Sequence, residues 1–417
     1  MKILYATRLF SGLESSFTNR KWIPTGVPTI YRIIEELDRN HDAIFIFTAK
    51  DSGLGYRSTW IEDRDLNQPI EGLIHKVYIL SGIRFFPSWL PRRLAMVFRD
   101  VRQSVIILKN VIFFKPDIVY CDHSNVMVAA IIARFIRKTP VLFRVMGVYP
   151  STKQTLNPSN LIHYFYRWAY KSPFTNVICT QDGSGVEEWL QNGLNPITKV
   201  KVWLNGADHI VLPKLIDRQL LNLTNLDPIL LYVGKLETYK GCYDFVHAIL
   251  YLLDSGKRGF HALIIGTGNE EEKLKELVNK NKYSKFFTFI KRLPHRQIYA
   301  AHSLCEIYIS MNHLGNLSNS NLEAIRANDC MIIPDSQPDN GIDVITKRLL
   351  GDAVVMVPKE NHVKLAEAIY QLLQSREKRD KNSAILRERK RDFLWTWDER
   401  INIEIDFLEK ICISKIS

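Results

Sequence analysis

The chain lacks any long run of uncharged apolar residues. A helix that crosses a membrane needs about 18 or more such residues in succession, and no stretch of that kind occurs in the 417-residue sequence. The opening residues Met1–Ala6 also have too short an apolar run for a secretory signal, so we expect them to form a strand. We therefore expect a cytoplasmic protein, either free or attached peripherally to the inner face of the cell membrane.

Paired cysteine motifs are missing as well. The chain has 6 cysteines, and none of them forms a CxxC pair. Without such pairs, buried reduced thiols of a cytosolic protein are the expectation. No repeat of the length found in solenoid proteins is visible either, which argues against a repeat architecture.

What the chain does have is apolar content and positive charge. Hydrophobic residues make up 46% of it and charged residues 24%, which is typical of a globular protein and excludes a disordered one. The formal net charge of +12 predicts an anionic partner. Charge alone does not choose among a nucleotide, a nucleic acid and a membrane surface.

Strand-like and helix-like segments alternate along the whole chain. This alternation is typical of α/β domains built on a mostly parallel sheet, and a chain of this length favours two domains. The apolar runs expected as strands are residues 3–6, 43–48, 117–120, 141–143, 176–179, 229–233, 262–265, 287–290, 307–310, 331–333 and 354–357.

We therefore predict two Rossmann-like domains that face each other across a cleft. The first spans residues 1–207 and the second residues 229–395. Residues 208–228 have weak periodicity and two prolines, which predicts an interdomain linker. Residues 396–417 have apolar positions at helical spacing and are expected as a helix that returns to the N-terminal domain. Because ligands bind beyond the carboxyl ends of such strands, loops of both domains would line the cleft.

The most informative segment is Val233–Gly241, at the end of the strand expected at 229–233. It places Lys235 and Lys240 on the turn where a strand becomes a helix. Backbone N–H groups, a helix N-terminus and two ammonium groups together suit a diphosphate. Glu323, much later, offers a carboxylate for a ribose diol. The alternatives are solvated surface lysines and, for Glu323, a carboxylate favoured by the helix dipole.

Several short motifs, in their order and spacing, resemble the family-four (group 1) retaining glycosyltransferases of the GT-B fold over nearly the whole chain. The motifs are Gly26-Val27-Pro28, Lys115–Val119, Trp203–Asp208, Gly234-Lys235, Lys240-Gly241, Gly266-Thr267-Gly268, Leu322-Glu323-Ala324 and Phe393–Trp397. The resemblance implies an enzyme that moves a sugar from a nucleotide-diphosphate donor to a glycan or lipid-linked acceptor with retention of configuration. It also implies a role in the synthesis of cell-surface polysaccharide or another glycoconjugate.

The resemblance implies roles for individual residues. Lys235 and Lys240 would bind the donor diphosphate, with Lys235 as a point charge where the family often has arginine. Glu323 would match the second glutamate of the family's E-x7-E motif, which holds the ribose hydroxyls. Other residues would bring backbone or N–H groups close to the donor: Gly26, Gly234, Gly266, Gly268, Asn319, Ser320, Asn321 and Leu322.

Two positions depart from the family pattern. Gly315 stands where the motif has its first glutamate, which contacts the transferred sugar, and Met146 stands where many relatives have a histidine near the reacting carbon. Arg144, at the end of a strand, is a candidate for catalysis, with a structural ion pair as the alternative. Weaker candidates, for which ordinary loop roles stay open, are His123, His313 and Asn316.

No metal and no cofactor are expected. Asp63-Arg64-Asp65 spells the DxD pattern that binds metal in a different glycosyltransferase fold, but it stands in a polar loop without a strand before it. Protein cations and helix ends would hold the leaving diphosphate instead. The resemblance implies attack from the front face, in which a phosphate oxygen takes the acceptor's proton and no dedicated base is needed.

Two apolar features precede the strand at 117–120. A stripe at helical spacing is expected to pack a helix onto its sheet, and it consists of Leu94, Phe98, Val101, Val105, Leu108 and Ile112. The aromatic and basic stretch Arg84–Arg93 is expected to lie on an anionic membrane surface, which would suit a lipid-linked acceptor.

Three alternatives stay open. A catalytically weak GT-B module that binds nucleotide or a partner is suggested by Gly315 and Met146. A nucleotide-sugar epimerase of the same fold is the second. A nucleic-acid-binding protein is suggested by the charge, but the chain has no recognised nucleic-acid module, so we expect no such partner.

Overall fold

The computed structural model describes residues 1–52, 60, 62, 64–83, 91–209, 218–221, 223, 227–335 and 344–413. The chain forms two compact units. The first comprises Met1–Thr180, Val186–Trp203 and Trp397–Ser417, and the second comprises Gln181–Gly185 and Leu204–Thr396.

The first unit is built on one eight-stranded sheet with the order β3-β4-β2-β1-β5-β6-β7-β8. Neighbouring strands run parallel, except that β3 pairs antiparallel with β4 at one edge. Strands β1 and β5 lie side by side where the order of connections reverses. The strands are β1 (Lys2–Arg8), β2 (Asp42–Thr48), β3 (Leu66–Gln68), β4 (Val77–Leu80), β5 (Ile118–Asp122), β6 (Val141–Val145), β7 (Asn176–Thr180) and β8 (Lys199–Trp203).

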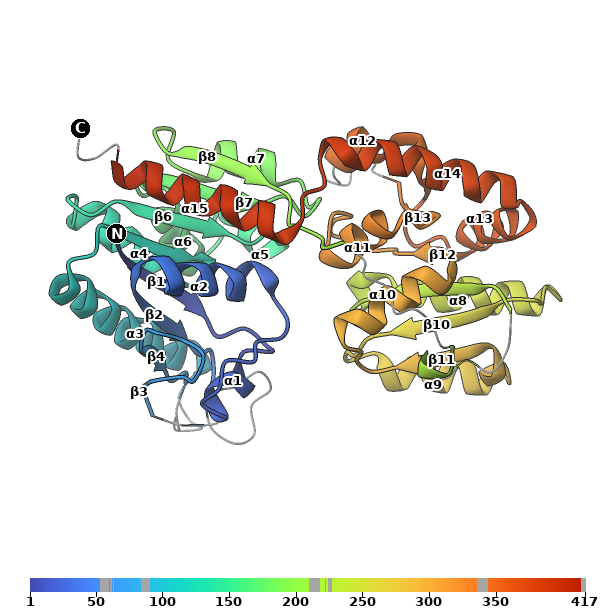
Figure 1. Ribbon diagram of the computed structural model, residues 1–417, viewed down its shortest axis with the longest axis horizontal. Helices are drawn as coiled ribbons and strands as arrows, with labels where there is room; N and C mark the ends of the chain where they lie inside the picture. The colour runs from blue at the N-terminus through green and yellow to red at the C-terminus, as the bar shows by residue number, and fades with distance from the viewer. Residues whose placement is uncertain are drawn as a thin grey trace. The chain divides into compact units, whose positions relative to one another are not determined.

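Helices cover both faces of this sheet (Figure 1). One face packs against α3, α4, α6 and α7, and the other against α2 and the C-terminal helix α15. Helix α2 begins with Pro28 in its first turn, where proline costs no hydrogen bond. The helical segments are α1 (Glu14–Thr18), α2 (Pro28–Asn40), α3 (Arg92–Phe114), η1 (His123–Asn125), α4 (Val126–Phe135), α5 (Pro150–Lys153), α6 (Leu161–Tyr170), α7 (Val186–Gly193) and α15 (Trp397–Ile413).

The second unit has a six-stranded, wholly parallel sheet with the order β11-β10-β9-β12-β13-β14. Strands β9 and β10 are mostly apolar and almost wholly buried, as parallel strands between two helical layers must be. The strands are β9 (Ile229–Val233), β10 (His261–Ile265), β11 (Phe287–Ile290), β12 (Cys305–Ile309), β13 (Met331–Pro334) and β14 (Val355–Val357).

Helices follow nearly every strand of the second unit. Two apolar cores, one on each face of the sheet, hold them in place. The segments are η2 (Arg218–Leu221), η3 (Thr238–Lys240), α8 (Cys242–Asp254), α9 (Glu271–Lys280), η4 (Ser284–Phe286), α10 (His295–Leu304), α11 (Asn319–Ala327), α12 (Val344–Leu350), η6 (Gly351–Ala353), α13 (His362–Gln374), α14 (Arg376–Arg389) and η7 (Lys390–Asp392).

The two Rossmann-like units confirm the predicted fold class. Helix α15 lies with the first unit, beside α2, as expected for a C-terminal helix that returns (Figure 1). The boundary falls between Trp203 and Leu204, whereas the sequence predicted it after Ala207. Within the predicted linker, Leu221 and Leu223 are buried in the core of the second unit.

The structure has three strands that the sequence analysis missed, β3, β4 and β8. Strand β8 alternates lysines with larger apolar residues and stays largely exposed at the sheet edge, so it gives little apolar signal. Strand β3 is only three residues long. Among the described helices, none is long and apolar enough to cross a membrane.

The prediction for the apolar stripe of α3 was wrong. Helix α3 does pack on the sheet, but through Ile107 and Val111, with Gln103 on the same buried side. Five of the six stripe residues are exposed, and Leu108 is only partly buried. The stripe lies on the side of the helix turned away from the sheet, because its positions are offset from the buried ones by more than a quarter turn.

Candidate functional site: the switch point of the second sheet

The strand order of the second unit creates a place for a ligand between β9 and β12. The connections from β9 run toward β10 and β11, whereas β12 starts the opposite half of the sheet. At such a reversal the loops after the two central strands diverge and leave a crevice at their carboxyl ends. The loop after β9 contains Lys235 and Lys240, and the loop after β12 leads into α11.

Hydrogen bonds from Tyr232 fix the backbone of the loop after β9. The hydroxyl of Tyr232, at the end of the strand, lies 3.0 Å from the carbonyl oxygen of Lys235 and 3.2 Å from that of Lys240. Gly241 then starts α8 with a φ of 72°, and a Cβ there would lie 2.1 Å from the carbonyl oxygen of Met311. Only glycine suits this position, so the sequence Lys240-Gly241 sets both the turn and its close contact with the β12 loop.

The two lysines differ in their surroundings. Lys235 is exposed, and Lys240 is partly buried beside the ring of Tyr239. Burial lowers the pKa of Lys240; attraction by Asp182 opposes this effect, and repulsion by Lys235 adds to it. A second anion next to Lys240 would favour its charged form, so the loop is suited electrostatically to bind one.

The glycines after β10 allow the backbone of the loop after β9 to pack closely against them. A Cβ on Gly266 would lie 1.8 Å from the carbonyl oxygen of Gly234, and one on Gly268 would lie 2.1 Å from that of Leu236. The N–H of Leu236 donates to the carbonyl of Thr267 at 3.0 Å, which fastens the two loops together. The missing side chains thus make room for neighbouring backbone, a role that the sequence analysis did not consider.

Helix α11 points its first turn at the same edge of the sheet. Ser318 is its N-cap but makes no side-chain capping hydrogen bond, so the first N–H groups are not closed off by that side chain. Asn319 accepts a hydrogen bond from Asn205 at 2.7 Å. The side chain of Asn321 is buried and binds Tyr308 and the carbonyl of Asn316, which fixes the loop before the helix.

Glu323 lies one turn further along α11 and is buried. It is outside the first turn, where the helix dipole stabilises a carboxylate most, so that alternative explanation is weakened. Burial is the main reason that the pKa of Tyr308 lies above its usual value, and the charge of Glu323 adds to the rise. Glu323 therefore occupies a low-dielectric position near Tyr308 of β12.

Gly315 departs from the family pattern for a reason that the structure shows. A Cβ at this position would lie 2.5 Å from the carbonyl oxygen of Asp182 and 2.6 Å from the carbonyl carbon of Gly183. The N–H of Leu317 donates to the same Asp182 oxygen at 3.1 Å. The segment Gln181–Gly185 thus lies against this loop, and a glutamate side chain would not fit there.

Arg144 lies in the first unit and is fully buried, with 0% of its surface exposed. Its guanidinium contacts the carboxylate of Glu404 on α15 and the hydroxyl of Tyr120 at 2.8 Å. Arg400 lies 2.8 Å from the other oxygen of Glu404. Our proposal of a catalytic Arg144 is therefore corrected to the structural alternative, because the side chain has no exposed surface with which to meet a substrate.

Gly26 also belongs to the first unit. Its φ is 97°, and a Cβ would lie 2.5 Å from the carbonyl oxygen of Ser11. Glycine is therefore required by the loop between α1 and α2 itself. Asp63 and residues 84–90 lie outside the described residues, so the DxD pattern and most of the basic aromatic stretch have no structural outcome.

The sequence analysis missed a cavity in the first unit. It has a volume of about 370 Å³ and lies at the carboxyl ends of β1, β2 and β5, which is the switch point of that sheet. Its cationic lining residues are Arg8, Lys50 and Arg99. Arg8 ends the strand at 2–8 and Lys50 follows the strand at 42–48, so their places at strand ends could have identified them.

His123 also lines this cavity, as a neutral group. Its Nε2 lies 2.7 Å from the hydroxyl of Tyr170, and burial lowers the pKa of the imidazole to about 4. His163 and Tyr166 complete the side formed by α6. The arrangement combines cations with hydrogen-bonding groups, as expected for a polar ligand that carries negative charge.

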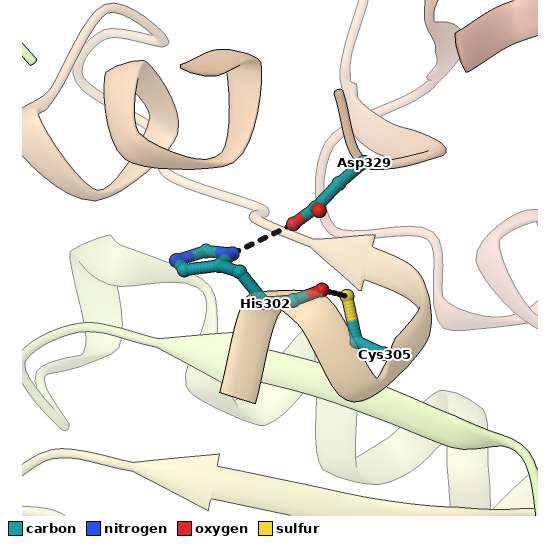
Figure 2. A group of neighbouring side chains, drawn as sticks. All are labelled: His302, Cys305 and Asp329. Atoms are coloured by element: carbon teal, nitrogen blue, oxygen red, sulfur yellow. Dashed lines mark hydrogen bonds and ion pairs between the residues drawn. The ribbon is translucent and has the colours of Figure 1, made fainter. Parts of the chain in front are cut away.

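One group of side chains in the described residues could hold a metal ion. His302, Cys305 and Asp329 bring their ligand atoms within 4.8 Å of one another. Figure 2 shows the imidazole of His302 turned to Asp329, at 2.6 Å, and the thiol of Cys305 turned to the carbonyl of His302, at 3.2 Å. The group lies at the amino ends of β12 and β13, opposite the switch point. Burial and the charge of Asp329 hold the pKa of the Cys305 thiol well above its usual value, which disfavours the thiolate that metals bind.

Comparison with known proteins agrees with this arrangement. Residues 214–389 match the family model of glycosyl transferases group 1. The uncharacterized glycosyltransferase MJ1059 of Methanocaldococcus jannaschii is 22% identical over 294 residues, which cover 63% of this chain and 70% of that protein.

Solved structures share the fold of nearly the entire chain. Sucrose-phosphate synthase from Thermosynechococcus elongatus superimposes with a TM-score of 0.71 at 15% identity, over 99% of each chain. Anabaena HepE in complex with UDP and glucose gives a TM-score of 0.68 at 16% identity, over 98% of this chain and 99% of that one. The resemblance to group 1 glycosyltransferases of the GT-B fold is therefore confirmed.

Proposed function

Because the chain resembles the group 1 glycosyltransferases in sequence and has the GT-B fold, we propose that it transfers a sugar from a nucleotide-diphosphate donor. The observation that carries this proposal is the switch point of the second sheet. There the strand–turn–helix segment with Lys235 and Lys240 follows β9, and the loop after β12 leads to the N-terminus of α11 and the buried Glu323. The structure of HepE in complex with UDP and glucose supports a donor of this chemical class.

The two lysines have complementary tasks in this proposal. As the glycosidic bond to the donor breaks, negative charge develops on the departing diphosphate, and fixed cations stabilise it most when water is excluded. Lys240, partly buried, is the cation whose charge gains most from the diphosphate, since burial lowers its pKa. Lys235, exposed, would contact the outer phosphate as the donor enters.

Glu323 would accept hydrogen bonds from the ribose hydroxyls. A carboxylate has two acceptor oxygens, so it can accept from both hydroxyls of a diol, and Glu323 lies on the helix that follows the β12 loop. The free N–H groups at the start of α11 would face the phosphates. Because Gly315 leaves no room for a side chain, recognition of the sugar would rest on other residues of the β12 loop.

The cavity of the first unit would bind the acceptor, which we propose to be a glycan or a lipid-linked molecule with an anionic group. Arg8 and Lys50 supply the positive charge that such a group requires, whereas Arg99 pairs with Asp100, which also lines the cavity, at 2.7 Å. Retention of configuration, front-face attack and independence from metal are part of the same proposal. So are a role in cell-surface polysaccharide synthesis and a cytoplasmic location at the inner face of the membrane.

The proposal is tested by turnover with a panel of nucleotide sugars. The purified protein is incubated with each donor and a mixture of glycan and lipid-phosphate acceptors, and nucleoside diphosphate release and the anomeric configuration of the product are measured by NMR. We expect acceptor-dependent release with one donor and a retained anomer. The double variant Lys235→Ala/Lys240→Ala should lower kcat/KM at least tenfold, ~1.4 kcal/mol.

The matched control is Lys378→Ala, which removes an exposed lysine of α14 in the same unit. Equal turnover of the double variant and the control would contradict the assignment of the lysines. Consumption of the donor without any acceptor would instead indicate the epimerase alternative. Donor binding without turnover would indicate a nucleotide-binding module, the alternative that Gly315 favours.

A further inference from the structure

Helix α3 exposes a row of large apolar side chains to solvent along its whole length. The fractional exposure is 66% for Phe98, 57% for Val101 and 59% for Ile112. Leu94 and Val105 lie in the same row and are also exposed. Helices of soluble proteins normally turn such a row to the core, so an outward row that runs the length of a 23-residue helix requires a partner.

Helix α6, in the same helical layer, adds a second outward row. Leu161 and Phe165 are 76% and 61% exposed, and Tyr164 and Trp168 are exposed beside them. These four positions are spaced i, i+3, i+4 and i+7, so they share one side of the helix, opposite the buried Tyr170. We call the two rows together the apolar face of the first unit.

The charges of this layer have one predominant sign. Helix α3 carries five Lys or Arg and one Asp. Three of these cations are ion-paired, Arg99 with Asp100 at 2.7 Å, Arg92 with Asp51 at 3.1 Å and Arg102 with Asp65 at 2.6 Å. Helices α4 and α6 each carry one Arg and no acidic residue. Lys109 is exposed and lies next to Val105 and Ile112 on the surface of α3. Helix α7, further along the sheet, adds the acidic groups Glu187 and Glu188.

The opposite helical layer of the same sheet has the reverse character. Helix α15 carries five acidic residues against two basic ones, and α2 carries three against two. Among the described large apolar side chains of these two helices, only Ile413 is exposed. The combination of exposed apolar rows and positive charge therefore belongs to one side of the unit.

We propose that the apolar face docks onto an anionic lipid bilayer. An interfacial helix has an apolar side that enters the headgroup region and cations beside it that meet anionic lipid. The rings of Tyr164 and Trp168 are amphipathic and suit the water–lipid boundary. A second copy of this chain fits less well, because a two-fold interface would bring the same cations against one another.

Docking here would also determine where the acceptor is found. Arg99 of α3 and Ile162, His163 and Tyr166 of α6 line the cavity of the first unit, so the cavity lies between the two helices that form the apolar face. A lipid anchored in the bilayer would present its phosphate close to this cavity. The position of the acceptor rests on the proposed transferase function, whereas the docking itself does not.

The test is co-sedimentation of the full chain with vesicles. Vesicles of phosphatidylcholine alone are compared with vesicles that also contain phosphatidylglycerol, at low and high salt. We expect binding to the anionic vesicles that weakens at high salt, because the charge contribution is screened. The triple variant Phe98→Ser/Val101→Ser/Val105→Ser should lower the vesicle partition coefficient about tenfold or more, since it removes the apolar contribution.

The matched control is Ile23→Ser/Ile74→Ser, which removes two exposed apolar side chains of the first unit away from α3 and α6. It should bind vesicles as the wild type does. All substituted positions are exposed, so both variants should keep the circular dichroism and melting temperature of the wild type. Charge reversal by Lys109→Glu should weaken binding to anionic vesicles only.

Three results would overturn the proposal. The wild type could fail to bind anionic vesicles, or the triple variant could bind them as well as the control does. The wild type could also sediment as a dimer that the triple variant loses, which would assign the face to a second copy. Release of nucleoside diphosphate with a water-soluble acceptor is measured in parallel, so that loss of docking is distinguished from failure of the transferase proposal.

Discussion

The two sheets have the same arrangement of central strands but differ at their switch points. In the first unit β1 and β5 meet beside a cavity of about 370 Å³ with dispersed cations. In the second unit β9 and β12 meet beside backbone loops fastened to one another, with Lys235 and Lys240 on a short turn. The same topology thus supports a roomy site in one unit and a tightly built one in the other, because the loops decide what a switch point can bind.

The difference reflects the ligands that we propose. A diphosphate is small and has fixed geometry, so glycine-rich loops and a helix N-terminus can enclose it. An acceptor varies in size and needs room more than close backbone contact. Substitutions can therefore distinguish charged residues and glycines that contribute to ligand binding from those that contribute only to the stability of the fold.

The largest expected effect concerns Arg144, which the sequence placed in the site and the structure places in the core. Arg144→Met leaves the carboxylate of Glu404 buried with one partner fewer, and we expect the unfolding free energy to fall by about 3–5 kcal/mol. Urea denaturation measures this loss, with Arg39→Met on the exposed side of α2 as the control. An unchanged denaturation midpoint together with lost turnover would return Arg144 to catalysis.

Gly315→Ala tests the tight packing of the second site. The added Cβ would lie 2.5 Å from the carbonyl oxygen of Asp182, so we expect a loss of about 1–3 kcal/mol in unfolding free energy. Gly234→Ala is the matched control, because its Cβ would be 3.5 Å from its nearest neighbour, the hydroxyl of Tyr232. Thermal denaturation of both variants decides the matter, and equal melting temperatures would show that the segment Gln181–Gly185 does not restrict residue 315.

Lys50→Ala tests the roomy site of the first unit. Removing one cation from the cavity should raise the KM for an anionic acceptor about fivefold and leave the KM for the donor unchanged. Lys76→Ala is the control, since Lys76 is exposed before β4, at the other end of the sheet. A rise in donor KM for Lys50→Ala, or an equal effect of Lys76→Ala, would contradict the assignment of the cavity as the acceptor site.

The smallest expected effect is a pH dependence of donor binding. Burial lowers the pKa of Lys240, so its ammonium is lost at a lower pH than that of an ordinary lysine as the pH rises. We expect donor KM to increase by about threefold as the pH rises through that lowered pKa. Lys240→Arg keeps its charge over the same range and should flatten the profile. An identical rise in Lys240→Arg would assign the titration to another group.

The sequence predicted what depends on neighbours along the chain. The segment 229–241 carries its strand, turn and helix start in consecutive residues, so the positions of Lys235 and Lys240 followed from local pattern. The apolar stripe of α3 was visible too, but periodicity shows only that residues share a side of a helix. Which side meets the sheet depends on Ile107 and Val111, which gave no stronger signal than the stripe.

Contacts between distant segments were beyond prediction. Arg144 is paired with Glu404, 260 residues later, on a helix whose docking position no local pattern gives. The absence of a side chain at 315 is explained only by Asp182 from a distant loop. Arg8 and Lys50 of the cavity lie at or just after the ends of β1 and β2, two strands that the sequence predicted. Both residues were missed because no motif surrounds them.

The central claim is that the switch point of the second sheet binds a nucleoside diphosphate through Lys240. Isothermal titration calorimetry of uridine diphosphate against the wild type, Lys240→Ala and Lys378→Ala tests it most directly, because binding needs no acceptor and no turnover. The account predicts an affinity at least tenfold lower for Lys240→Ala, ~1.4 kcal/mol, and no change for Lys378→Ala. Equal affinities for all three proteins would contradict it.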